Sequence, residues 1–323
     1  KAILILVIGF VLLIKGADFF VEGSSSVAKK FHVPAMLIGM TIVAMGTSLP
    51  ECAVSVTASL ANNNSLAVSN VIGSNIFNLM VVCGACALFS PLTIRQDTLK
   101  KEFPLSIICA ALMLVLGYIG MTLGHIDGII FLVLFVGYLL WMIQSAKKAR
   151  AAVLSDPAQS GQIEQTEFVE ENIAILPTWK SLVFIIGGMI AIKFGGDFVV
   201  NGASSIASSM GLSQTLIGLT IVAMGTSLPE LVTSLVAAKK GEVDMALGNA
   251  IGSNIFNILM VLGIASAISP MAIITENIID LCVLIVFTVC VWIFAGTKKK
   301  IGRVEGFCMV AFYAAYAIYI IIR

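Results

Sequence analysis

Two copies of one short motif place polar residues inside runs that are otherwise apolar. The first copy is Gly-Thr-Ser-Leu-Pro-Glu at residues 46–51, and the second is the same six residues at 225–230. Each copy combines two hydroxyls, a proline and a carboxylate. Within a membrane span, a carboxylate costs roughly 2.5–3.5 kcal/mol on insertion scales. Two carboxylates that recur at equivalent positions, each next to a helix-breaking proline, indicate a cation-binding site that compensates for this cost.

The spacing within the first motif brings its oxygen atoms together. A proline inside a helix removes one N–H and clashes with the carbonyl four residues earlier, so Pro50 is expected to free the carbonyl of Gly46. Thr47 and Glu51 are four residues apart and share one helix face, with Ser48 beside them. The second motif repeats this arrangement. Such irregular backbone is tolerated in a membrane only where it is buried in protein or lines a water-filled cavity.

A following apolar segment in each half adds further oxygen ligands. Ser74 and Asn78 are four residues apart, and Ser253 and Asn257 repeat that spacing. Hydroxyl, amide, carboxylate and carbonyl oxygens suit hard cations such as Ca²⁺, which takes six to eight of them. The two motif carboxylates match the charge of one Ca²⁺. Serines and glycines in membrane helices also serve close packing alone, which is the simpler interpretation for Ser24, Ser25, Ser26 and Gly73.

The composition is that of an integral membrane protein. Of 323 residues, 59% are hydrophobic and 11% are charged, whereas soluble domains carry about 25% charged residues. The net charge of +1 provides no basic excess for binding nucleic acid. The seven cysteines could bind metal or do redox chemistry, but most lie in apolar runs and are expected to be packing residues.

Ten segments are apolar and long enough to span a bilayer, which takes about 20 residues. They are 2–28, 34–60, 66–90, 103–122, 126–146, 179–208, 213–238, 244–269, 277–296 and 303–322. We therefore predict an all-α membrane protein with five helices in residues 1–146, a polar loop at 147–178 and five more helices in 179–323. Helices 2 and 7 are expected to be broken at the two motifs.

The two halves are an internal repeat at an offset of 179 residues. Residues 37–51 and 216–230 are identical at 14 of 15 positions, and 70–78 and 249–257 differ once. A repeat this close indicates two similar structural units meeting at one site. Because each half has an odd number of predicted spans, the second half must enter the membrane with inverted topology.

The distribution of basic residues predicts the orientation. Lys and Arg collect in cytoplasmic loops. They follow the first, third, seventh and ninth predicted spans and flank the central loop, and the other loops carry none. This pattern predicts a multi-pass protein of the cell (inner) membrane, with both termini outside and the loop at 147–178 in the cytoplasm.

At these motifs, the sequence resembles the sodium/calcium exchanger family of the cation/Ca²⁺ antiporter superfamily, in its prokaryotic form. The resemblance implies a cation site formed by both halves, which includes the backbone carbonyls of two alanines. The implied residues are Ala44, Thr47, Ser48, Glu51, Ser74, Asn78, Ala223, Thr226, Ser227, Glu230, Ser253 and Asn257. Some family members, among them the potassium-dependent exchangers, carry Asp at the position of Asn257. Two carboxylates instead of three argue against potassium co-transport.

The leading hypothesis is secondary antiport of Na⁺ against Ca²⁺, with alternating access to a site at the membrane midplane. The alternatives are Ca²⁺/H⁺ antiport, with Glu51 and Glu230 taking protons, and a passive cation channel. An intramembrane hydrolase would need a base near Ser48 or Ser227, and no His or Lys lies near either in the sequence. We therefore expect a protein that is not an enzyme, has no cofactor, binds Ca²⁺ and Na⁺ as transported ions, and works as a monomer in the lipid bilayer.

Two acidic residues in the predicted spans have basic neighbours in the sequence. Lys15 and Asp18 are three residues apart, and Lys193 and Asp197 are four apart. Ion pairs within each helix would lower the cost of inserting these charges, and we expect both pairs to form. The alternative is that these charges act in the gating of a moving helix pair.

Overall fold

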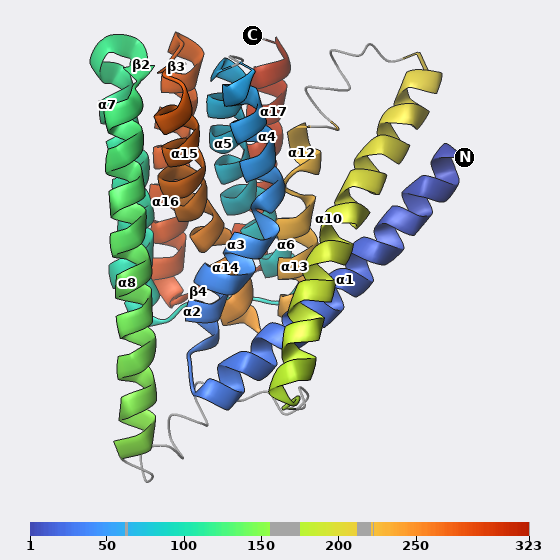
Figure 1. The fold of residues 1–323 in the computed structure, drawn as a ribbon, viewed down its shortest axis with the longest axis vertical. Coiled ribbons are helices and arrows are strands. Elements are labelled where there is room, and N and C mark those ends of the chain that lie inside the picture. Colours follow the sequence, from blue (N-terminus) through green and yellow to red (C-terminus); the bar gives the residue numbers. More distant parts are fainter. Residues whose placement is uncertain (62–63, 156–174, 212–220, 222, 323) are drawn as a thin grey trace.

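The computed structural model describes residues 1–61, 64–155, 175–211, 221 and 223–322, and this part of the chain is almost entirely helical (Figure 1). The α-helices are α1 (Ala2–Phe31), α2 (Ala35–Ile38), α3 (Ala44–Thr47), α4 (Leu49–Leu60), α5 (Asn64–Phe77), α6 (Cys83–Phe89), α7 (Phe103–Tyr118), α8 (His125–Ser155), α10 (Thr178–Ser209), α12 (Ala223–Gly225), α13 (Leu228–Lys239), α14 (Val243–Phe256), α15 (Leu262–Ile268), α16 (Thr275–Lys298) and α17 (Arg303–Ile322). Many are joined by single π-helical turns into longer rods.

Eight described helices are long and apolar enough to cross a membrane, and a bent pair makes a ninth. The predicted segment 213–238 begins among residues outside the described part of the chain. The helix that contains the predicted span 126–146 is longer than the span: α8 continues to Ser155, so the first residues of the polar segment 147–178 are helical. The Ala, Lys and Arg residues there are good helix formers, and they extend the helix beyond its apolar part.

The helix expected to break at the first motif is bent by 48°. It consists of α2, the π-helical turn η1 (Gly39–Val43) and α3, and it resumes as α4 after Ser48. In the second half, α12 ends at Gly225 and α13 begins at Leu228, so the regular helix is interrupted at the same place in the repeat.

The elements around the centre recur at the offset of the sequence repeat. α4 and α13 have equivalent bounds, as do α5 and α14, and α6 and α15. Two short antiparallel ribbons tie the halves together. Strand β1 (Leu92–Thr93) pairs with β4 (Lys300–Ile301), and β2 (Thr122–Leu123) pairs with β3 (Met271–Ala272).

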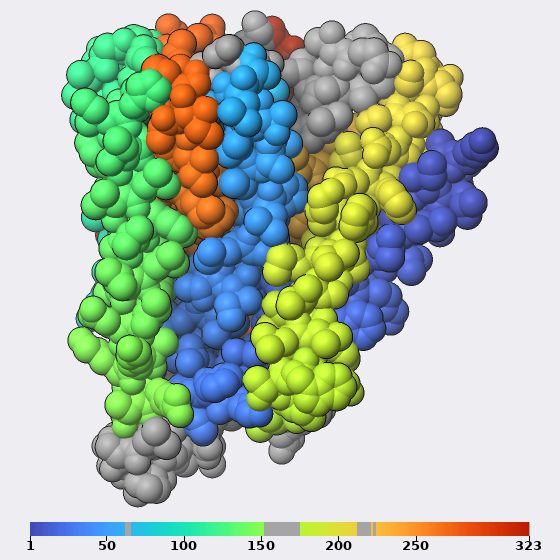
Figure 2. All heavy atoms as spheres, viewed as in Figure 1, coloured from blue at the N-terminus to red at the C-terminus, as the bar shows by residue number. Residues whose placement is uncertain are grey.

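Helices α1 and α10 lie side by side along one edge of the molecule and pack through glycines (Figures 1 and 2). A Cβ atom on Gly16 would lie 2.8 Å from the backbone nitrogen of Ile192, and one on Gly195 would lie 2.6 Å from that of Leu13. No side chain fits at these positions, so the two backbones are in direct contact. The ladder consists of Gly9, Gly16, Gly23, Gly188, Gly195 and Gly202.

The core of the described structure lies around α5 and α14, whose spans are the most buried of the candidates. The outer helices α1, α8 and α17 instead expose large apolar side chains, including Ile3, Val133 and Phe307. A buried polar centre surrounded by exposed apolar helices is the arrangement expected of a protein in lipid.

Candidate functional site

The break in the first motif begins a new helix. Pro50 lies in the first turn of α4, where a missing N–H leaves no hydrogen bond unmade. The Ser48 N–H still donates to the carbonyl of Ala44 at 3.0 Å. Thr47 Oγ1 also lies 3.4 Å from this carbonyl oxygen, so the carbonyl of Ala44, which was expected to be a ligand, already accepts hydrogen bonds from both Ser48 and Thr47. Ala223 begins α12 in the equivalent place.

The two motifs exchange hydrogen bonds across the centre of the molecule. Ser48 Oγ donates to Glu230 Oε1 at 2.8 Å, and Ser227 Oγ donates to Glu51 Oε1 at 3.0 Å. All four residues have an exposed fraction of 0%. The carboxylate of each half is thus held by the serine of the other half, so the site exists only where the halves meet.

Six other buried oxygens of the predicted site have no hydrogen-bond partner among the described residues. They are the second oxygen of each motif carboxylate and the side-chain oxygens of the serines and asparagines that lie four positions apart on the following segments. The buried atoms are Glu51 Oε2, Glu230 Oε2, Ser74 Oγ, Ser253 Oγ, Asn78 Oδ1 and Asn257 Oδ1. Buried polar groups are almost always paired, so a cluster of unpaired oxygens around two carboxylates is suited to a cation.

Two π-helical turns place the site asparagines. Asn78 begins η2 (Asn78–Val82) and Asn257 begins η6 (Asn257–Val261), directly after α5 and α14. Such turns add one residue to a helical turn and are common at functional sites. Asn257 Nδ2 donates to Asn75 Oδ1 at 3.2 Å, and this bond leaves the other amide atom, Oδ1, without a partner in the described residues.

In each half, one asparagine side chain bonds the helix that carries the motif glutamate to the segment that follows it; we call each asparagine with its serine partner a bracket. Asn249 Nδ2 donates to Ser234 Oγ at 2.9 Å and to the carbonyl of Glu230 at 3.4 Å. Asn70 does the same to Ser55 Oγ at 3.0 Å and to the carbonyl of Glu51 at 3.4 Å. The brackets lie at equivalent positions of the repeat. They fix the backbone that carries the carboxylates.

Thr47 also belongs to this network. Its Oγ1 lies 3.2 Å from the carbonyl of Val43 and 3.1 Å from Oδ1 of Asn249. Thr47 is buried and Thr226 is half-buried. The two threonines therefore flank the crossed serine–carboxylate pairs, although their surroundings differ.

The bracket residues and a second pair of asparagines were not among the site residues predicted from the sequence. Asn75 Nδ2 donates to the carbonyl of Asn254 at 3.2 Å, and Asn254 Nδ2 donates back to the carbonyl of Asn75 at 3.0 Å. These bonds join α5 to α14. The signal was present, because Asn70, Asn75 and Ser55 are polar residues in apolar segments and each has an identical counterpart 179 positions later.

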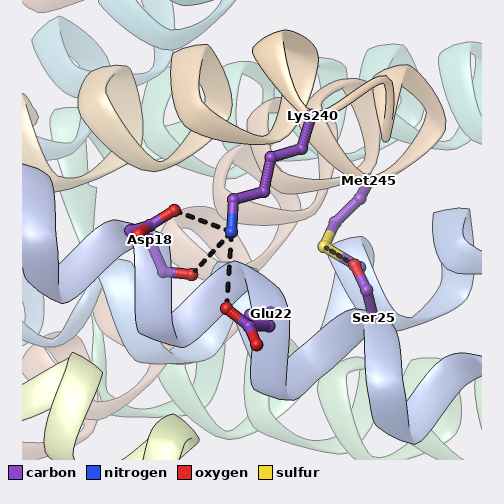
Figure 3. Close-up of polar contacts among 5 residues, drawn as sticks. All are labelled: Asp18, Glu22, Ser25, Lys240 and Met245. Atoms are coloured by element: carbon purple, nitrogen blue, oxygen red, sulfur yellow. Dashed lines mark hydrogen bonds and ion pairs between the residues drawn. The ribbon is translucent and has the colours of Figure 1, made fainter. Parts of the chain in front are cut away.

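One of the two expected intrahelical ion pairs is present and the other was predicted wrongly. Lys193 Nζ lies 2.7 Å from Asp197 Oδ2 within α10. Asp18 instead pairs with Lys240, which follows α13: Nζ lies 2.7 Å from Asp18 Oδ1 and 3.7 Å from Glu22 Oε2 (Figure 3). Because α1 packs against α13, the ammonium group of Lys240 lies beside Asp18, although the two residues are 222 positions apart in the sequence.

The fold and the buried centre define a class of protein: a multi-pass membrane protein with two similar halves and a central cluster of oxygen-bearing side chains. A family model described as sodium/calcium exchanger protein matches residues 1–144 and 180–322. The chain belongs to the sodium/calcium exchanger family.

Relatives and solved structures agree with this placement. The chain is 41% identical to CaxA of Alkalimonas amylolytica, named as a candidate antiporter, over 98% of this chain and 97% of that protein. It is 31% identical to the sodium/calcium exchanger MaX1 of Methanosarcina acetivorans, with the same coverage. A solved structure of the sodium-calcium exchanger NCX_Mj, soaked with Na⁺ and Sr²⁺, superposes with a TM-score of 0.81 at 33% identity, covering 97% of each chain.

Proposed function

We propose that this protein is a secondary antiporter that exchanges Na⁺ for Ca²⁺ by alternating access to the site between its halves. The observation that carries the proposal is the set of buried oxygens without partners around Glu51 and Glu230. Two carboxylates balance one Ca²⁺, and the hydroxyl and amide oxygens complete a coordination shell of six to eight. Na⁺ has a similar radius and competes for the same oxygens.

Competition at one site couples the two ion flows. If the site faces one side at a time, Ca²⁺ leaves only when Na⁺ replaces it, and the Na⁺ gradient then drives Ca²⁺ transport. The names of MaX1 and NCX_Mj support these two ions as the substrates. The twelve residues predicted from the sequence are the proposed ligands, either through their side chains or, at Ala44 and Ala223, through their backbone carbonyls.

The proposed architecture has ten membrane helices in two inverted repeats. Both ends of the chain lie at the same end of the molecule, which supports an even number of crossings (Figure 1). We further propose that residues 1–146 and 179–323 form the two repeats, that the monomer is the functional unit in the bilayer, and that the protein has no resident cofactor and is not an enzyme.

Exchange in vesicles tests the ion coupling. In inverted membrane vesicles loaded with Na⁺, radioactive Ca²⁺ uptake is expected to follow the imposed Na⁺ gradient and to persist when a protonophore removes any pH gradient. Replacing K⁺ with choline is expected to leave the rate unchanged, because Asn257 adds no third carboxylate. Uptake that follows a pH gradient and ignores Na⁺ would support Ca²⁺/H⁺ antiport, and uptake with no counter-ion gradient would support a channel.

Cysteine labelling tests the orientation. Single cysteines at Lys29, Lys239 and Glu167, introduced on a cysteine-free background, are expected to resist an impermeant thiol reagent applied to intact cells, since basic loops remain in the cytoplasm. A cysteine at Gly124 is expected to react. Permeabilised cells provide the control, where the first three should also react. Labelling of positions 29 and 239 from opposite sides would contradict the inverted repeat.

A further inference from the structure

The contact made by Lys240 joins the end of α13 to α1. Asp18 and Glu22 lie on α1, which is tied to α10 by the glycine ladder. Lys240 follows α13, the helix that carries Glu230. Besides the two carboxylates, Lys240 Nζ reaches the backbone carbonyl of Asp18 at 3.3 Å (Figure 3). A second contact, from Ser25 Oγ to Met245 Sδ at 3.8 Å, lies beside it.

The charges are partly shielded from water. The side chains of Lys240, Asp18 and Glu22 have exposed fractions of 24%, 35% and 30%. One ammonium between two carboxylates is held more firmly than a single exposed pair, in which each side chain moves freely. Lys240 therefore acts as a clamp between α1 and the end of α13.

The other half of the repeat lacks this clamp. At the offset of 179 residues, Asp18 corresponds to Asp197, Glu22 to Asn201 and Lys240 to Ala61. Ala61 has no charge to offer, and Asp197 pairs with Lys193 on its own helix. In the part of the chain that the structure describes, the second half therefore has an ion pair between these helices at a position where the first half has none.

A cavity of about 250 Å³ lies on the side without the clamp. It separates α10 from α4 and is lined by Asp197 and Asn201, by Pro50 and Ala53, and by Thr226 of the second motif. Because α1 and α10 run antiparallel, with Gly9 facing Val199 and Gly16 facing Ile192, the cavity and Lys240 lie toward opposite ends of the helix pair.

We propose that Lys240 is a positioning residue that closes the exchanger on the side of Asp18 and Glu22, so that the ion site rests open toward the cavity beside Asp197. The proposal rests on alternating access, which is part of the proposed function. Opening the Lys240 side requires α1 to leave α13, and this breaks both ion pairs. Among the described residues, no ion pair joins Asp197 to the end of α4, so opening that side breaks no equivalent contact there, and the equilibrium between the two states favours the state open on the Asp197 side.

Two reporter cysteines on a cysteine-free background test this bias. Ala237→Cys lies three residues before Lys240, on the same helix face, where the exposed fraction is 1%. Ala53→Cys lines the cavity on the other side. The alkylation rate of each is measured in detergent without Na⁺ or Ca²⁺, and the ratio of the rate at position 237 to that at position 53 reports which side is open.

Lys240→Gln is expected to raise this ratio by about fivefold, the change that corresponds to losing an ion pair of this exposure. Lys240→Arg and the neighbouring Lys239→Gln should keep the original ratio. The charge exchange Asp18→Lys with Lys240→Glu should restore it. The proposal is overturned if Lys240→Gln leaves the ratio unchanged, including the case in which both rates rise equally because the fold has loosened.

Failure of this proposal can be distinguished from failure of the proposed function. If the unaltered protein exchanges Na⁺ for Ca²⁺ but the ratio does not change in Lys240→Gln, the clamp is absent and the transport function stands. If the ratio changes as expected but no exchange occurs in vesicles, the clamp stands and the assignment of the ions is wrong.

Discussion

Glu51→Gln and Glu230→Gln are each expected to abolish Na⁺-driven Ca²⁺ uptake in inverted vesicles while the protein still accumulates in the membrane. Each substitution keeps the shape of the side chain and removes one of the two negative charges at the site. Losing one partner of a buried charge pair costs roughly 3–5 kcal/mol, which lowers affinity by more than about a hundredfold. Protection by Ca²⁺ against thermal unfolding measures this loss of binding independently of transport.

The matched control for these variants is Glu276→Gln. Glu276 lies exposed in the first turn of α16, away from the crossed serine–carboxylate pairs, and its replacement should leave uptake and Ca²⁺ protection unchanged. The proposed site is refuted if either Glu51→Gln or Glu230→Gln transports at the rate of the unaltered protein.

Gly195→Ala is expected to destabilise the protein by about 3 kcal/mol. The added Cβ atom would lie 2.6 Å from the backbone nitrogen of Leu13 and 2.9 Å from the carbonyl oxygen of Gly9. Backbone atoms cannot rotate away as a flexible side chain does, so α1 and α10 must separate, at the upper end of the 1–3 kcal/mol typical of overpacking. Denaturant unfolding in detergent, followed by tryptophan fluorescence, measures the change.

Gly187→Ala is the control on the same helix. A Cβ atom there meets nothing within 4 Å, and replacing glycine by alanine inside a helix stabilises it by roughly 0.5–1 kcal/mol. The two variants make the same chemical change and are expected to alter stability in opposite directions. Equal effects on stability would show that the glycine ladder does not hold α1 against α10.

The central residues could be predicted from the sequence because polar side chains stand out in an apolar chain. Placing Glu51 and Glu230 inside a membrane costs free energy, so such residues are kept where they have a function. Their recurrence at a fixed offset is not explained by chance. Ser48 and Ser227 were found for the same reason. The structure adds that each serine donates a hydrogen bond to the carboxylate of the opposite half, a contact that cannot be predicted from the spacing of residues within one motif.

Other features depended on contacts between distant segments and could not be predicted locally. Lys240 lies 222 residues from Asp18, and only the packing of α1 against α13 brings it nearer than Lys15. The π-helical turns at Asn78 and Asn257 have no signature in residue type, because both begin ordinary apolar stretches. The end of α8 was not predicted, because the search for apolar spans stops at the first lysines and arginines, whereas the helix continues through them.

The reciprocal hydrogen bonds at the centre have two-fold symmetry. Ser48 binds Glu230 as Ser227 binds Glu51, and Asn75 binds Asn254 as Asn254 binds Asn75. In a symmetric homodimer, every contact of this kind must occur twice. The central contacts are therefore those that two identical half-length subunits would make when paired about a two-fold axis. The halves differ outside this cluster, at positions such as Lys240 and Ala61, and these differences distinguish the two ends of an otherwise symmetric molecule.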